Sequence, residues 1–444
     1  MTKYFGTSGI RGEVGKDINC ELAFKLGVAL SKYRTNPRVV IARDTRPSGG
    51  ILSHSVSLGI LSMGGTILDI GVCPTAGVSF LTKLLNADFG VVVTASHNIN
   101  IFNGFKIFNK AGEELCIAEE EELERFMLEP ITLDYSKAGE YYTCPENVEI
   151  YAEFLENVTS VTLDGLKIVL DNANGAGSAV TERVFKNLGA EVVSISNNPS
   201  GVFINEGVGA LHPELLVQRV LEENADCGFA YDGDADRVIV VSMSGKVYDG
   251  DTIMYVLANY LHSLGKLKQN LIVCTTLSNG GILNQLKTRG VGAIISSVGD
   301  RNVSEKMAEI GANLGGEVSG HIILSDYQSV SDGILASLIL AEVLKITGEK
   351  LDILMDAETL PQKTINCATN FGDEIIESYE LKAVINSVSA SLGDFGRVVV
   401  RKSGTEKVIR VMVESESLSL STLYAETIAK VILELNKIHQ KGQI

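Results

Sequence analysis

The chain has 444 residues, of which 45% are hydrophobic. It contains no tryptophan and carries a formal net charge of −17. At ~100–200 residues per domain, this length predicts three or four domains. The negative charge excludes nucleic acid and anionic membrane surfaces as expected partners. The seven scattered cysteines never form a Cys-x-x-Cys pair, which argues against a zinc site or disulfide framework. With no signal peptide and no apolar run of ~18–20 residues, we expect a cytoplasmic protein.

A unit of strand, helix and strand is repeated three times along the chain. Its first strands are predicted at 39–42, 167–170 and 271–274, and its second strands at 66–70, 192–195 and 293–295. Each copy adds a further strand before an unusual loop, at 91–93, 228–231 and 312–314. The near-continuous apolar strands indicate sheets buried on both faces. Because ligands bind beyond the carboxyl ends of strands in open α/β sheets, we expect the three loops to converge on one cleft.

The first of these loops contains Ser96, followed by the polar pair His97 and Asn98. We expect an exposed serine here that can act as a nucleophile or phosphate carrier; the alternative is a serine that caps the next helix. Lys106 follows in an apolar setting, where partial burial would lower its pKa toward general acid/base use; the alternative is a surface lysine. Upstream, Arg11 lies in a glycine-rich segment of the kind that brings backbone close to a ligand.

The second loop carries three aspartates at alternate positions, Asp232, Asp234 and Asp236, followed by Arg237. Apolar strands on both sides argue against a solvated acidic turn. Alternate residues of an extended stretch point to one side, so the carboxylates repel one another unless a cation sits among them. Hard oxygen ligands suit magnesium, which would hold a phosphoryl group. An EF-hand is excluded, because its sixth and twelfth positions need glycine and glutamate and here hold Arg237 and Met243.

The third loop, residues 315–321, offers polar groups suited to a sugar phosphate. Glu317 and Ser319 supply an acceptor and a donor for sugar hydroxyls, and His321 could grip phosphate or substrate. These side chains are therefore candidates for substrate recognition.

The C-terminal part reads as a small α+β domain, with strands at 397–400 and 408–413 and a helix from about 420 to 437. The turn between the strands contains Arg401, Ser403, Gly404 and Thr405. Gly404 permits backbone shapes with several N–H groups facing one point, and a guanidinium grips phosphate bidentately. The turn is thus a candidate phosphate site, with a polar hairpin turn as the alternative.

Together, these motifs resemble those of the α-D-phosphohexomutase family, which interconverts sugar 1-phosphates and 6-phosphates. The resemblance spans nearly the whole chain, through segments 6–12, 94–98, 232–237, 316–321 and 401–406 in the family's order. The chain is most similar to the branch that acts on glucosamine phosphates, through segments 298–301, 315–321 and 403–414, with Asn205 and 212–214. Ile99, Lys402 and Lys407 stand where the family usually has proline, which changes loop stiffness and adds positive charge near the phosphate loop.

The resemblance implies an isomerase with three related α/β units, whose sheets are mixed and mostly parallel, and a small C-terminal α+β phosphate-binding domain. The implied boundaries are 1–150, 151–250, 251–362 and 363–444. Glucosamine 6-phosphate and glucosamine 1-phosphate would interconvert through a phosphoserine at Ser96 and a sugar bisphosphate, which also serves as activator. One magnesium ion per chain would be held by a phosphoserine oxygen and the three aspartates.

The resemblance also implies roles for the remaining residues. Lys106 would be the general acid/base, helped by Arg11 and His97, while Arg237 would add positive charge. The implied substrate ligands are Glu317, Ser319, His321, Arg301, Arg401, Ser403, Gly404, Thr405 and Arg410. The expected partners are small phosphosugars, and the resemblance leaves open whether the protein forms a homodimer.

Three other functions stay open at this point. A phosphoglucomutase/phosphomannomutase would use the same chemistry on another sugar. A haloacid-dehalogenase-type phosphatase would use the first aspartate as nucleophile and would not need Ser96. A non-catalytic sugar-phosphate sensor would bind without turnover, although the intact serine, lysine and aspartates argue against it.

Overall fold

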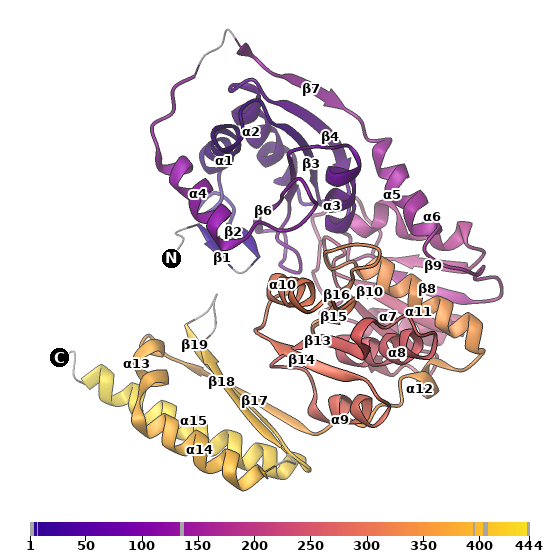
Figure 1. The fold of residues 1–444 in the computed structure, drawn as a ribbon, viewed down its shortest axis with the longest axis vertical. Helices are drawn as coiled ribbons and strands as arrows, with labels where there is room; N and C mark the ends of the chain where they lie inside the picture. The colour runs from indigo at the N-terminus through magenta and orange to yellow at the C-terminus, as the bar shows by residue number, and fades with distance from the viewer. Residues whose placement is uncertain (1–3, 7, 134–136, 394–395, 403–406, 442–444) are drawn as a thin grey trace. The chain divides into compact units, whose positions relative to one another are not determined.

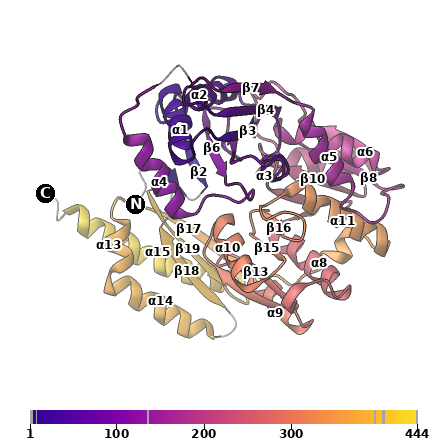
Figure 2. The same ribbon diagram turned by 45° about the horizontal axis from the view of Figure 1, so that its top comes forward.

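The computed structural model describes residues 4–6, 8–133, 137–393, 396–402 and 407–441. It divides into two compact units, the larger made of residues 1–275 with 293–356 and the smaller of residues 276–292 with 357–444. Figure 1 and Figure 2 show the helices and strands of both units. No helix among the described residues is long and apolar enough to cross a membrane.

The first sheet of the larger unit has the strand order β1-β2-β6-β5-β3-β4-β7. Its strands are β1 (Phe5–Gly6), β2 (Gly9–Glu13), β3 (Arg38–Arg43), β4 (Thr66–Val72), β5 (Phe89–Val93), β6 (Phe102–Phe108) and β7 (Glu140–Thr143). β5, β3, β4 and β7 run parallel, and β6, β2 and β1 extend one edge antiparallel. The accompanying helices are α1 (Cys20–Tyr33), α2 (Gly49–Leu61), α3 (Thr75–Leu84), α4 (Ile117–Leu128) and α5 (Asn147–Glu156).

Helices α1 and α2 pack unusually closely against each other over one face of this sheet (Figure 1). A Cβ on Gly27 would lie 2.1 Å from the carbonyl oxygen of Val56, and one on Gly59 would lie 2.3 Å from that of Phe24. Only glycine permits such an approach. The pair buries apolar side chains of β3 and β5.

The second and third sheets follow the same plan with fewer strands. The second has the order β12-β11-β10-β8-β9 and the third has the order β14-β13-β15-β16. Their strands are β8 (Lys167–Asp171), β9 (Glu191–Ile195), β10 (Cys227–Tyr231), β11 (Val238–Ser242), β12 (Val247–Tyr248), β13 (Leu271–Thr275), β14 (Gly292–Ser296), β15 (Leu314–Gly316) and β16 (Ile322–Leu324). The helices of these regions in the larger unit are α6 (Thr181–Asn187), α7 (Glu214–Glu223), α8 (Gly250–Ser263), α10 (Asp300–Ile310), α11 (Gly333–Thr347) and α12 (Leu351–Leu354), with short 3₁₀ turns at Ala176–Ala179 and Lys268–Asn270.

The predicted threefold repeat is present in these sheets. In each, a parallel strand (β5, β10 or β15) turns back into an antiparallel neighbour (β6, β11 or β16). The three turns are the three loops singled out in the sequence. The third strand is displaced from the prediction, since β15 begins at Leu314 and takes Gly315 and Gly316 into the sheet. Three mixed α/β sheets confirm the predicted fold class for this part of the chain.

The smaller unit contains a separate antiparallel sheet of order β17-β19-β18. Its strands are β17 (Gln362–Ala368), β18 (Arg397–Lys402) and β19 (Val408–Glu414), and its helices are α9 (Gly280–Thr288), α13 (Gly372–Glu377), α14 (Tyr379–Leu392) and α15 (Leu418–Lys441). Helices α14 and α15 lie over one face of this sheet (Figure 1). Their apolar residues form a buried core with those of the strands. The unit is the predicted small α+β domain with its two apolar strands and long last helix, joined by α9.

Candidate active site

The loop between β10 and β11 brings Asp232, Asp234 and Asp236 together in a buried cluster. The three residues are at most 1% exposed, and one carboxylate oxygen from each lies within 4.8 Å of the others. The loop is tight, because the Ala235 N–H donates to the Asp232 carbonyl over 3.0 Å and Ala235 has a left-handed φ of 59°. The alternating aspartates thus form one acidic site, as their spacing predicted.

Two observations show that this site fits a divalent cation. Oδ1 of Asp234 is buried and, among the described residues, has no hydrogen-bond partner. Burial, followed by repulsion from Asp236 and Asp234, raises the pKa of Asp232 to about 7. Protein groups alone therefore compensate the negative charge of the three buried carboxylates poorly. Carboxylate oxygens of this kind are ligands that suit Mg²⁺.

Lys106, on β6, partly neutralises the cluster. Its ammonium donates to Oδ2 of Asp234 over 2.8 Å and also to Oδ2 of Asp236. The prediction that burial would lower the pKa of Lys106 is wrong. Burial does act in that direction, but the charges of Asp234 and Asp236 outweigh it and raise the pKa of Lys106 above its ordinary value. The lysine is consequently protonated at neutral pH.

Ser96 lies in the loop between β5 and β6, with its Oγ 2.7 Å from Oδ2 of Asp232, to which it donates a hydrogen bond. The prediction that Ser96 is exposed is wrong, since its side chain is fully buried beneath the aspartate loop. Its backbone has a left-handed φ of 51°, an uncommon conformation for serine. The loop therefore directs Ser96 toward the carboxylates, where a cation held by them would also reach its oxygen.

His97 and Arg11 lie near Ser96 and Lys106, respectively. Nδ1 of His97 is 3.4 Å from Oγ of Ser96. Burial, with the charges of Arg237 and Arg11, lowers the pKa of His97 to about 3, so the imidazole is neutral. Arg11 stands on β2 beside β6, and its buried Nε has no hydrogen-bond partner within the described part of the chain.

The loop between β15 and β16 meets the aspartate loop through His321. Its Nδ1 lies 3.0 Å from Oε2 of Glu317, and its Nε2 lies 3.2 Å from Oδ1 of Asp236. Burial opposes the charged form, but Asp236 outweighs it and raises the pKa of His321 to about 10. Glu317 also accepts a 2.7 Å hydrogen bond from the N–H of Gly299, and Ser319 lies at its edge, with Oγ 3.5 Å away.

Two arginines predicted near the cleft have different surroundings. Arg237 lies beside the cluster, with Nε 4.0 Å from Oδ2 of Asp232 and its backbone bridged to that of His321. Arg301, at the start of α10, instead forms a 2.7 Å ion pair with Glu120 of α4 and donates to the Leu115 carbonyl. The guanidinium of Arg301 therefore links two elements of the larger unit.

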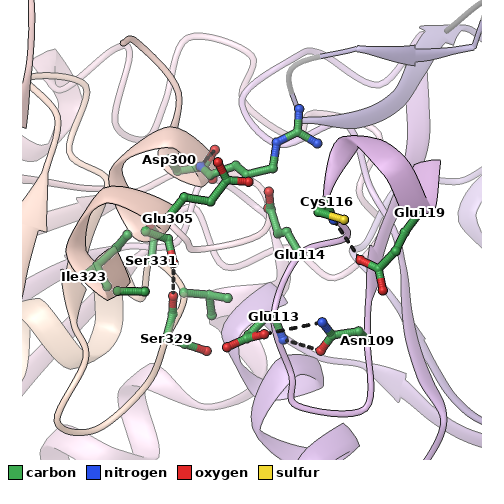
Figure 3. Close-up of a pocket in the computed structure, with 14 residues that line it drawn as sticks. Asn109, Glu113, Glu114, Cys116, Glu119, Asp300, Glu305, Ile323, Ser329 and Ser331 are labelled. Atoms are coloured by element: carbon green, nitrogen blue, oxygen red, sulfur yellow. Dashed lines mark hydrogen bonds between the residues drawn. The ribbon is translucent and has the colours of Figure 1, made fainter. Parts of the chain in front are cut away.

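An acidic pocket of about 200 Å³ adjoins this site (Figure 3). One wall is the segment between β6 and α4, with Glu113 and Glu114, and the other is α10, with Asp300 and Glu305. Burial and the neighbouring Asp300 raise the pKa of Glu114 to about 8. Asp300 connects the pocket to the aspartate site, because its carboxylate is within 4.8 Å of ligand atoms of Asp236 and His321.

Sequence reasoning missed Thr75 at the start of α3. Its Oγ1 donates to Oδ2 of Asp234 over 2.6 Å, and its N–H donates to the Asp234 carbonyl over 3.0 Å. Both bonds orient the central aspartate, and neither involves its Oδ1. The only signal available in the sequence was the position of Thr75 after a predicted strand of the same repeat.

In the smaller unit, the described residues next to the predicted phosphate loop include Arg401 and Arg410. Arg401 on β18 and Arg410 on β19 are directly paired in register. Paired residues of an antiparallel sheet project from the same face, so both guanidinium groups lie on one side of the sheet. Ser403, Gly404 and Thr405 lie outside the described residues.

Comparison with known proteins agrees with this arrangement. The phosphoglucomutase/phosphomannomutase models match the chain in order: the alpha/beta/alpha domain I at residues 2–132, domain II at 149–245, domain III at 249–360 and the C-terminal domain at 365–431. A phosphoglucosamine mutase from Latilactobacillus sakei is 42% identical over 444 residues, covering 97% of this chain and 99% of the relative. The chain belongs to the phosphoglucomutase/phosphomannomutase family.

Other family members support the same assignment. The phosphoglucosamine mutase of Bacillus subtilis is 39% identical, covering 97% of this chain and 98% of the relative. A family structure from Burkholderia thailandensis has a TM-score of 0.79 at 24% identity, covering 97% of this chain and 98% of that one. An Aspergillus fumigatus N-acetylphosphoglucosamine mutase, solved with GlcNAc-6P and magnesium, has a TM-score of 0.69 at 17% identity, covering 98% and 96%. The last two show the shared fold.

Proposed function

We propose that the protein is a phosphoglucosamine mutase, an isomerase that interconverts glucosamine 6-phosphate and glucosamine 1-phosphate. Full-length relatives of that name at about 40% identity support the substrate. The observation that carries the chemistry is the 2.7 Å contact of the Ser96 hydroxyl with Asp232 in a buried site of three carboxylates. A serine so placed is suited to carry a phosphoryl group between the two positions of the sugar.

In the proposed reaction, the phosphoryl group leaves Oγ of phosphorylated Ser96 for the free hydroxyl oxygen of the sugar phosphate. The P–O bond to serine breaks as the bond to the sugar forms, the hydroxyl proton passes to a base, and Oγ regains a proton. The resulting bisphosphate turns over and returns its other phosphoryl group to Ser96. Sugar bisphosphate supplied from outside would phosphorylate Ser96 initially and so act as activator.

Asp232, Asp234 and Asp236 would hold one Mg²⁺ with an oxygen of the phosphorylated serine. The ion would supply positive charge to stabilise the transferring phosphoryl group. The chain's own Lys106 and Arg237 lie against the same carboxylates and keep further positive charge beside the reacting oxygen.

We assign proton transfer to Lys106 and His97, with Arg11 beside them. Lys106 is held by two carboxylates in the protonated form that can donate a hydrogen bond and a proton to an oxygen leaving phosphorus, while its raised pKa makes it a weaker acid than an ordinary lysine. His97 is neutral and lies within 3.4 Å of Oγ of Ser96. A phosphoryl dianion there would raise the pKa of His97, because a nearby negative charge favours the imidazolium.

The sugar hydroxyls are proposed to form hydrogen bonds with Glu317, Ser319 and His321. Arg301, at the start of α10, is proposed to add a further contact with the substrate. Arg401, Arg410 and the loop that contains Ser403, Gly404 and Thr405 are proposed to bind the phosphate that is not reacting. A guanidinium recognises phosphate by charge and bidentate geometry, so this site can accept either orientation of the sugar.

We further propose domain boundaries at 1–150, 151–250, 251–362 and 363–444, a cytoplasmic location and phosphosugars as the small-molecule partners. A homodimer is compatible with this function and would be measured by light scattering.

The experiment that tests the function is a coupled assay with glucosamine, glucose and mannose phosphates side by side. We expect the highest kcat/KM with glucosamine phosphate and no net release of inorganic phosphate. A preference for glucose or mannose phosphate would identify a phosphoglucomutase/phosphomannomutase instead. Release of phosphate without isomerisation would contradict the mutase assignment and support a phosphatase.

A further inference from the structure

The side chain of Arg46, in the loop between β3 and α2, is the buried centre around which the Ser96 loop folds. Arg46 is 1% exposed. Its Nη2 donates to the carbonyl oxygens of Ser96 (2.9 Å) and Asn98 (2.6 Å), and its Nη1 donates to those of Ile99 (2.5 Å) and Phe102 (3.0 Å). One guanidinium thus satisfies four carbonyls over the whole turn from β5 to β6.

Asp44 orients this guanidinium. Its Oδ2 accepts from Nε of Arg46 over 2.9 Å and from Oγ1 of Thr94 over 2.7 Å, and its Oδ1 accepts from the Arg46 N–H over 3.0 Å. Oγ1 of Thr94 accepts in turn from the N–H of Ser96 over 2.9 Å. Both backbone polar groups of Ser96 are therefore fixed by one buried network that starts at Asp44.

Asn205, in the loop between β9 and α7, also holds the Ser96 backbone. Nδ2 of Asn205 donates to the carbonyl oxygens of Ser96 and Asn98, each over 2.8 Å. The aspartate loop touches the same point, since a Cβ on Gly233 would lie 2.6 Å from the Ser96 carbonyl oxygen and 2.7 Å from Nδ2 of Asn205. The Ser96 backbone is consequently locked to the loop whose carboxylate its side chain must reach.

We propose that Arg46 is a positioning residue for phosphoryl transfer, which holds Ser96 in its left-handed conformation and aims Oγ at the aspartate site. The inference rests on the proposed role of Ser96 as phosphoryl carrier. The Asp44 carboxylate neutralises Arg46 through Nε, and the four bonds from Nη1 and Nη2 go to backbone carbonyls. Arg46 therefore acts through backbone geometry, and the Ser96 side chain stays available to gain and lose a phosphoryl group.

The test uses the full chain with Arg46→Met, Arg46→Lys and Asn205→Ala, and Arg43→Met as matched control. Arg43 is the last residue of β3, directly before the same loop, and among the described residues its side chain donates a hydrogen bond only to the Asp44 carbonyl, over 3.3 Å. Each protein is phosphorylated with glucose 1,6-bisphosphate, its phosphoserine content is counted by intact mass, and single-turnover transfer to glucosamine 6-phosphate is followed by rapid quench. Rate constants are expressed per phosphorylated serine, so that loss of folded protein does not lower them.

We expect Arg46→Met to lower the transfer rate constant about 100-fold, the order of loss that a 1 Å misplacement produces. Arg46→Lys should fall between Met and wild type, because an ammonium has three donors and cannot span four carbonyls. Asn205→Ala should lower the transfer rate constant about tenfold. This variant leaves Arg46 in place, so it still tests the proposal if the Arg46 variants do not fold. Half-saturation by glucosamine 6-phosphate should stay unchanged in all of them, as should the Mg²⁺ affinity of the unphosphorylated proteins, which depends on the three aspartates, and Arg43→Met should match wild type.

Wild-type transfer rates in folded, phosphorylated Arg46→Lys and Asn205→Ala would overturn the positioning role, as would a loss confined to substrate half-saturation. A wild-type protein that takes no phosphoryl group on Ser96 would overturn the proposed function itself. The phosphoserine content of the wild-type protein after incubation with glucose 1,6-bisphosphate therefore distinguishes the two failures.

Discussion

The two regions proposed to handle phosphate are built in different ways. Around Ser96, the polar groups are almost fully buried and bonded to one another, with Lys106 between Asp234 and Asp236. In the smaller unit, Arg401 and Arg410 lie half-buried on one face of a three-stranded sheet. The difference teaches that bond-making needs a dry, preorganised site, whereas holding a spectator phosphate needs only accessible positive charge that ignores the sugar.

The largest effect should come from Ser96→Ala. Removing the hydroxyl removes the proposed carrier, so kcat should fall at least ~10⁴-fold, as for other covalent nucleophiles. Intact mass should show no added phosphoryl group after incubation with glucose 1,6-bisphosphate. Full turnover by this variant would place the phosphoryl carrier elsewhere.

Asp234→Asn should rank second. It leaves Lys106 paired with Asp236 but removes the carboxylate with the orphaned oxygen, so kcat should fall about 10²–10³-fold, the loss typical of one electrostatic group in a preorganised site. Calorimetry should show weakened Mg²⁺ binding, and EDTA should abolish wild-type activity until Mg²⁺ is restored.

Asp352→Asn is the matched control for Asp234→Asn. Asp352 accepts hydroxyl hydrogen bonds from Ser242, Ser244 and Tyr248 in the same unit, but has no contact with the aspartate cluster among the bonds described. It should keep normal Mg²⁺ affinity. Equal Mg²⁺ affinity for both variants, or normal activity in EDTA, would argue against a metal site at the three aspartates.

Arg401→Ala should have an intermediate effect. Loss of a charge-assisted phosphate contact costs ~1.5–3 kcal/mol, or roughly ten- to a hundredfold in kcat/KM. KM should rise for both phosphosugars alike, while Ser96 phosphorylation and Mg²⁺ affinity stay unchanged. Lys382→Met is the control in the same unit, because Lys382 on α14 forms an exposed pair with Glu377 that contributes little. Impairment in one reaction direction only would refute an orientation-independent phosphate site.

Arg301→Met should have the smallest effect on catalysis, with kcat/KM reduced less than about tenfold. Its main consequence should be lower stability, up to ~3 kcal/mol, because Glu120 is left buried without its partner. A double-mutant cycle with Glu120→Gln, read by denaturant unfolding and by KM, separates the two roles. A large KM increase that Glu120→Gln does not share would make Arg301 mainly a substrate ligand.

Much of the site followed from the sequence because its parts stand at equivalent strand ends. Ser96, Asp232 and Glu317 each come just after the third strand of a repeat, and parallel strands place such loops at one edge of each sheet. Their types and spacing then indicated phosphoryl chemistry and a metal. The local sequence pattern was sufficient to predict these residues, because each motif lies within a single short loop.

What could not be predicted depends on contacts between distant segments. Ser96 is buried because the aspartate loop, more than a hundred residues later, covers it. The pKa of Lys106 is raised because two carboxylates of that same loop outweigh burial. The role of Arg46 depends on four carbonyls some fifty residues away, and carbonyls carry no sequence signal.

The most direct test follows labelled phosphate through Ser96. The protein is loaded from radiolabelled glucose 1,6-bisphosphate, the labelled peptide is mapped, and unlabelled glucosamine 6-phosphate is added in a single turnover. We predict alkali-sensitive, hydroxylamine-resistant label on Ser96 that passes to sugar bisphosphate at a rate sufficient for kcat. Hydroxylamine-sensitive label on Asp232, or label released directly as inorganic phosphate, would contradict the phosphoserine route.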